Sequence, residues 1–174
     1  MAEAKAIADT LVSPNERLAY FAKMLGAFGV IMALGILPAQ FVSGPLVNAM
    51  LFIVCVIIGR RSAMLLAVAP SPLALLFGVL PIVLAPMIPF IILGNIIMIY
   101  GFDYLSKKNY WFGVGLGALL KFIWLYLASQ LMLTYFITGS VSAKIATMMS
   151  WPQLLTALLG GTIAYVFLKV IKKI

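Results

Sequence analysis

The chain consists almost entirely of long apolar runs separated by short polar or charged interruptions. Apolar runs of about 20 residues are long enough to cross the hydrocarbon core of a bilayer as helices. Charged residues, proline and glycine bound six such runs, at 19–38, 44–59, 62–80, 87–105, 112–137 and 152–171. The pattern therefore predicts an all-α polytopic membrane protein built as a six-transmembrane-helix bundle.

The residues ahead of the first run have a different character. Ser13-Pro14-Asn15-Glu16 has the form of a capping box with proline at the first helical position. A short helix is therefore expected to begin there, within a cytoplasmic N-terminal segment at 1–18. Residues 19–174 then form a single transmembrane domain.

Basic residues gather at one set of span ends, and this asymmetry predicts the orientation. With six crossings, Lys144 lies on the opposite side and Lys121 lies within a span. By the positive-inside rule, a multi-pass protein of the cell membrane with both termini cytoplasmic is expected. The other ten of the 12 basic residues share one side: Lys5, Arg17, Lys23, Arg60, Arg61, Lys107, Lys108, Lys169, Lys172 and Lys173.

Composition narrows the possible functions. The chain is 65% hydrophobic and 9% charged, which is far from the composition of a soluble domain. Its net charge of +8 comes from residues that flank the spans, so nucleic acid is not an expected partner. The chain has no histidine, and Cys55 is its single cysteine, predicted to be a core residue. Cys/His metal sites and internal disulfides are therefore excluded, and no cofactor is expected.

An enzymatic function is not expected either. The acidic residues are Glu3, Asp9, Glu16 and Asp103, which form no carboxylate pair and no nucleophile–base set. The glycines of the segment 113–117 resemble a phosphate-binding loop superficially. They open a transmembrane run with no strand before it, so close helix packing is the better interpretation.

Lys121 is the most informative residue, because it lies deep within the apolar run GVGLGALLKFIWLYLASQLM. A charge at that depth costs at least ~2.5 kcal/mol and indicates a functional site by default. Three partners are open to it: an anionic ligand in a cavity, backbone carbonyls or cytoplasmic water, and Asp103 across a bent helix. At about 100° per residue, Trp124, Ala128 and Tyr135 share its helix face. This stripe suits a ring-bearing or carboxylated molecule, and simple helix packing would also explain it.

Other isolated polar residues are expected in the outer half of the bundle. They form either hydrogen bonds between helices or a common pocket outward of Lys121. The connection LPIVLAPMIPF contains three prolines and cannot be one straight helix. It forms either an ordinary loop or a rim over an outward-facing pocket. The polar residues in question are Asn48, Asn95, Gln153 and Thr156.

Small residues form a second stripe, on the first span. Ala22, Gly26, Gly29 and Ala33 fall within an arc of about 60°. Small residues let another helix approach closely, so the stripe is expected to pack within the bundle or to dock onto a separate membrane subunit.

Taken together, the chain resembles the S components of energy-coupling factor (ECF) transporters, the small membrane subunits that capture vitamins and other micronutrients. The resemblance covers about residues 19–173. It rests on size, six spans with both ends inside, the small-residue stripe, and the texture of particular segments: SGPLVNAMLFI, APMIPFIILGNIIMIY, GALLKFIWLYL and WPQLLTALLGGTIAY.

The resemblance implies a solute pocket near the outer face and docking through the first span. Docking would be onto a transmembrane coupling subunit served by two ATPase subunits, through Ala22, Gly26, Gly29 and Ala33. The pocket region lacks the richer charged and aromatic sets of many vitamin-specific members, which favours a smaller or more apolar solute. On this chain the pocket maps onto Asn95, Lys121, Trp124, Gln153 and Thr156.

A second hypothesis is a structural or assembly subunit of a larger membrane complex with no small-molecule ligand. It predicts an interior packed tightly around Lys121, with the amine reaching backbone carbonyls.

Overall fold

The computed structural model describes residues 14–35, 37, 40–135 and 146–174, and within these ranges the chain is helical with no β-strand. Four of the helices are long and apolar enough to cross a membrane, which is the character of a membrane protein. The elements in chain order are α2 (Pro14–Gly35), α3 (Gln40–Ile57), α4 (Arg60–Leu66), α5 (Pro70–Leu76), the 3₁₀ helix η1 (Ile82–Met87), α6 (Ile88–Ser106), α7 (Tyr110–Tyr135) and α9 (Trp151–Val170).

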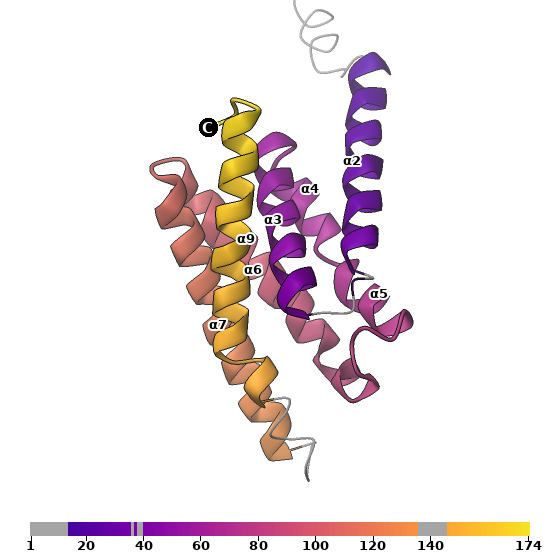
Figure 1. The fold of residues 1–174 in the computed structure, drawn as a ribbon, viewed down its shortest axis with the longest axis vertical. Coiled ribbons are helices and arrows are strands. Elements are labelled where there is room, and N and C mark those ends of the chain that lie inside the picture. The colour runs from indigo at the N-terminus through magenta and orange to yellow at the C-terminus, as the bar shows by residue number, and fades with distance from the viewer. Residues whose placement is uncertain (1–13, 36, 38–39, 136–145) are drawn as a thin grey trace, which may run out of the picture.

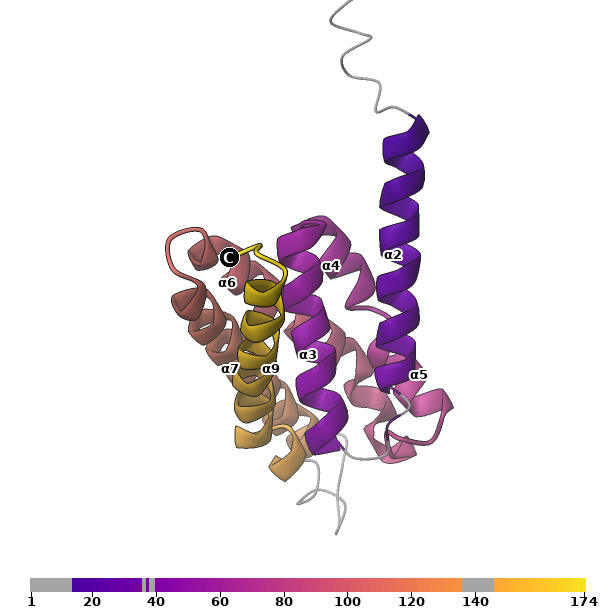
Figure 2. The ribbon, with the colours of Figure 1, turned by 45° about the horizontal axis from the view of Figure 1, so that its top comes forward.

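The long helices run up and down along one common axis (Figure 1). The closest packing is between α6 and α7, between α3 and α9, and between α7 and α9. The helix α2 stands at the edge of this group, against α3 and α5, and most of its surface is uncovered (Figure 2). The predicted helix start at Pro14 is confirmed, and α2 continues from there without a break at residue 18.

The prediction of one span over 62–80 is wrong, because this stretch forms two helices of seven residues each, α4 and α5. Pro70 has no N–H to donate, and its ring would clash with the carbonyl of Leu66 in a continuous helix. The chain tightens between them, with i→i−3 bonds from Val68 to Leu65 and from Ala69 to Leu66. The three-proline connection is also not a straight helix, as predicted, because η1 precedes α6.

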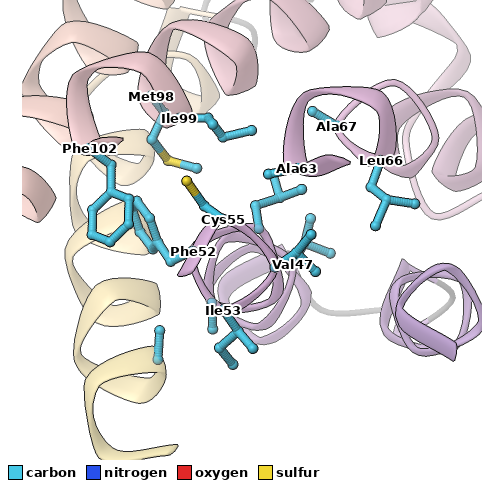
Figure 3. Packing of buried hydrophobic residues seen from close by; sticks show 14 of the residues in the cluster. Val47, Phe52, Ile53, Cys55, Ala63, Leu66, Ala67, Met98, Ile99 and Phe102 are labelled. Atoms are coloured by element: carbon cyan, nitrogen blue, oxygen red, sulfur yellow. The ribbon is translucent and has the colours of Figure 1, made fainter. Parts of the chain in front are cut away.

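The main apolar core is built largely by α3, α4 and α6 (Figure 3), with further residues from α2, α7 and α9. Phe52 of α3 packs against Phe102 of α6, with ring centroids 4.7 Å apart. Cys55 is buried in the same cluster beside Met98, which confirms that it is a core residue.

Glycines allow the helix backbones to approach closely. A Cβ atom at Gly113 would lie 2.8 Å from the carbonyl oxygen of Phe102, and one at Gly117 would lie 2.5 Å from that of Met98. The interpretation of the segment 113–117 as a helix-packing surface is therefore confirmed for Gly113 and Gly117, while a Cβ at Gly115 would meet nothing within 4 Å. Gly160 does the same for α9 against α3, because a Cβ there would lie 2.7 Å from the Cβ of Asn48.

The helix α2 begins and α9 ends at one end of the bundle (Figure 1), and the sequence places basic residues such as Arg17, Arg60, Lys107 and Lys172 near the helix termini at this end. Asp103 lies among them and accepts a hydrogen bond of 3.1 Å from Arg60, with Lys107 at 3.8 Å. Tyr20 of α2 shares a hydrogen bond of 2.9 Å with Ser62 of α4 at this end. These contacts connect α2, α4 and α6.

Candidate functional site

A cavity of about 290 Å³ lies between α3, α5, α6, α7 and α9, at the end of the bundle away from the basic side chains. Its volume is at the small end of the range for small-molecule sites, roughly 300–1,000 Å³. The polar residues that line it are Ser43, Asn48, Ser71, Asn95, Lys121, Gln153 and Thr156. The remaining described lining is apolar or glycine: Gly44, Val47, Pro70, Ala74, Val79, Leu80, Pro81, Ile91, Met148 and Met149.

Lys121 reaches this cavity from the middle of α7. Its side chain is 3% exposed, and its Nζ donates a hydrogen bond of 2.8 Å to Oδ1 of Asn48, which is 2% exposed. The alternative pairing of Lys121 with Asp103 is wrong, because Asp103 is bound to Arg60 at the basic end. An ammonium group has three donors, so the bond to Asn48 leaves two of them for other acceptors.

Asn48 is positioned by the packing of α9 on α3. Gly160 sits directly against it, and the missing side chain there lets the two helices approach. Because Asn48 lies at the ninth residue of α3, its amide is held at the depth of Lys121 on α7. An amide oxygen accepts from an ammonium group without adding a negative charge, so Asn48 supplies no counter-charge to Lys121.

Asn95 lines the cavity from α6 and is 3% exposed. Its Oδ1 is buried and has no hydrogen-bond partner within the described part of the chain. Buried polar atoms are bonded in the great majority of cases, so an exception at a cavity calls for an explanation. An incoming group that donates a hydrogen bond would satisfy this oxygen.

Gln153 and Thr156 line the cavity from the first two turns of α9. The Nε2 of Gln153 donates to the carbonyl of Met148 at 3.1 Å, and the hydroxyl of Thr156 donates to the carbonyl of Gln153 at 3.2 Å. The predicted group of Asn48, Asn95, Lys121, Gln153 and Thr156 is therefore gathered around one cavity.

Trp124 is not among the residues that line the cavity. Its Nε1 donates to the carbonyl of Phe90 at 2.9 Å, and its ring packs over the position of Gly94. Trp124 lies about one helical turn after Lys121 on α7, and its side chain points toward α6, where Gly94 leaves room for the indole. Tyr135 is the last residue of α7, and its side chain lies outside the described residues.

Several lining residues were not predicted from the sequence. Ser71 stands between Pro70 and Pro72, and the break of the predicted third span brings it to the cavity wall. Met148 is the last residue of a helical segment at 146–148, and Met149 lies in the turn between this segment and α9. A proline pair within an apolar run is the sequence signal that would have pointed to Ser71.

The charge balance of the cavity is one positive group with no acid among the described lining residues. No group of three His, Cys, Asp or Glu side chains in the described part is arranged to hold a metal ion. What these residues can do is attract an anion, donate to it from Lys121, and cover an apolar body with side chains such as Ile91 and Met149. This set of residues is suited to binding a solute.

The small-residue stripe of α2 is exposed along its whole length, at Ala22, Gly26, Gly29 and Ala33. A Cβ atom at either glycine would meet nothing within 4 Å. The expectation that this stripe packs within the bundle is therefore wrong. The opposite face of α2, which carries Ile31, provides the packing.

Comparisons of the chain with protein-family models, with curated proteins and with solved structures found no match. Function is therefore inferred from the cavity around Lys121 and from the exposed face of α2.

Proposed function

We propose that this chain is a substrate-capturing membrane subunit for the uptake of a small anionic micronutrient, similar to an ECF S component. The observation that carries the proposal is the buried Lys121 at a cavity with no acid among the described lining residues. A buried cation without a counter-charge is costly, and an anionic solute would supply that charge. The cavity favours this function over that of a structural subunit, which requires an interior packed around Lys121.

The proposed chain crosses the membrane six times, with α4 and α5 together making the third crossing. Both termini lie in the cytoplasm, and the cavity faces the outer side. The gathering of Arg60, Arg61, Lys107 and Lys108 at one end of the bundle, with the cavity toward the other, supports this orientation.

The proposed partners are a transmembrane coupling subunit and two ATPase subunits. Within its described residues this chain has no phosphate-binding loop, so energy for uptake would come from the partners. The exposed stripe of α2 is the proposed docking surface, since two adjacent glycine positions have open space above them.

Native mass spectrometry of the purified protein tests the proposed function. We expect wild-type protein to retain a small molecule of one defined mass, which is released on unfolding. Solute capture would be contradicted if the protein carried phospholipid alone. In that case it would retain no small molecule, and it would bind none of the small carboxylates added to it.

The docking surface is tested by the double change Gly26→Leu and Gly29→Leu. Two leucine side chains would fill the space that a partner helix needs, so we expect co-purification with a coupling subunit to be lost. Solute retention should persist, because α2 contributes no residue to the cavity lining.

Phe21→Leu serves as the matched control, because Phe21 is an exposed apolar residue of α2 outside the stripe. It should leave both readouts unchanged. If the double variant still co-purified at the wild-type level, the docking surface would have to lie elsewhere on the chain.

A further inference from the structure

The unpartnered oxygen of Asn95 adds a second requirement to the solute. Carboxamide oxygens accept hydrogen bonds and cannot donate them, and Oδ1 of Asn95 is buried without a partner in the described ranges. Lys121 does not supply the missing partner, because its Nζ donates to Oδ1 of Asn48. The cavity therefore contains the hydrogen-bond donors of Lys121 and, separately, the unpaired acceptor Oδ1 of Asn95.

The helix α6 holds Asn95 in this position. Gly94 packs tightly against α7, where a Cβ would lie 3.2 Å from Cγ of Leu125. The next residue, Asn95, is turned about 100° from that contact and lines the cavity together with Ile91, one turn before it. The acceptor is therefore fixed by helix packing and does not depend on a loop.

The net charge limits the solute further. Lys121 is the one charged residue among the described residues that line the cavity. A second negative charge on the solute would be buried without a counter-charge, which is strongly unfavourable. A solute with no charge would leave Lys121 uncompensated.

We propose that the solute is a small monoanion that also carries an N–H or O–H group. Its anionic group binds the two remaining donors of Lys121, its N–H or O–H donates to Oδ1 of Asn95, and its apolar body lies against Val47, Leu80 and Met149. This inference rests on the proposed function and specifies the chemical class of solute for the same cavity.

Two matched pairs of monocarboxylates provide the test. The first pair is 4-hydroxybenzoate and 4-methylbenzoate, which differ in a hydroxyl and a methyl of similar size. The second is an N-acyl amino acid and the corresponding O-acyl hydroxy acid, in which an ester oxygen replaces the amide N–H. We expect the donor-bearing member of a pair to bind wild-type protein about 10- to 100-fold more tightly, because its partner leaves Asn95 unsatisfied.

The variant Asn95→Leu should bind the two members of each pair equally. The control Thr162→Val changes an exposed residue of α9 and should keep the wild-type preference. High-resolution mass spectrometry of any molecule retained by wild-type protein should find one acidic group and at least one N–H or O–H.

Three results would overturn the inference and leave solute capture standing. These are a preference that survives in Asn95→Leu, equal binding of both members by wild type, and a retained molecule that is neutral, cationic or doubly acidic. Failure of all four probes to bind wild-type protein that holds a retained molecule of another class would also overturn it. Failure of every probe, with no small molecule retained, would instead overturn the proposed function itself.

Discussion

Lys121→Met is expected to abolish anion binding while the protein stays folded. Lysine and methionine both have unbranched side chains, so the change removes the charge and the donors with little change of shape. Hydrogen bonds that involve a charged group contribute about 1.5–3 kcal/mol each, and an anion would lose two of them. We expect affinity for the donor-bearing monocarboxylates to fall at least ~100-fold, equivalent to about 2.7 kcal/mol.

Binding titrations and circular dichroism in the same lipid nanodiscs would measure these two properties. Lys108→Met is the matched control, because it removes the same charge from an exposed position in the turn between α6 and α7. It should bind like wild type. Affinity of Lys121→Met within about threefold of wild type would show that Lys121 does not bind the solute.

Among substitutions of the residues that line the cavity, Asn48→Leu is expected to lower the stability of the protein most. Asn48 is the residue that receives the hydrogen bond of the buried Lys121 ammonium, so its replacement leaves a buried charge without that acceptor. The expected loss in the free energy of unfolding is about 1.5–3 kcal/mol. For a chain of this size that corresponds to a fall of roughly 3–12 °C in the unfolding midpoint, measured by thermal unfolding in nanodiscs.

The double variant Asn48→Leu with Lys121→Met isolates the interaction. With both partners apolar, no buried charge remains, and most of the lost stability should return. Asn95→Leu is the matched control, because it makes the same change at the same cavity to an amide whose Oδ1 accepts no hydrogen bond in the described part. If Asn48→Leu were no more destabilising than this control, the hydrogen bond to Lys121 would contribute nothing measurable.

The boundaries of two helices were predicted closely from the sequence, whereas α2 and α3 begin four or five residues before their predicted starts. The predicted spans 87–105 and 152–171 match α6 and α9 to within one residue at each end. The third span could not be predicted from hydropathy, because 62–80 is uncharged and mostly apolar and its break depends on Pro70. Hydropathy measures the free energy of moving side chains from water into an apolar medium. The break between α4 and α5 has another cause, because Pro70 lacks a backbone N–H and its ring clashes with the preceding turn.

The partner of Lys121 was beyond the reach of sequence reasoning. Asn48 lies 73 residues away, and the contact depends on which helices become neighbours. Periodicity along α7 places residues on a face, but it does not say which neighbouring helix that face meets. The assignment of Trp124 to the cavity failed for this reason, since Gly94 creates a nearer place for the indole.

The placement of α2 has a consequence for how docking and solute binding influence each other. No residue of α2 lines the cavity, yet α2 packs against α3 and α5, and both of these contribute to the cavity wall. If a partner docks on α2 as proposed, α3 and α5 are the helices through which it would influence the solute. Such coupling is reciprocal: a partner that weakens solute affinity by some factor is itself held less tightly, by the same factor, when the solute is bound. The change in solute affinity on docking and the change in docking affinity on solute binding would then measure the same coupling free energy, with α3 and α5 as the helices between the two sites.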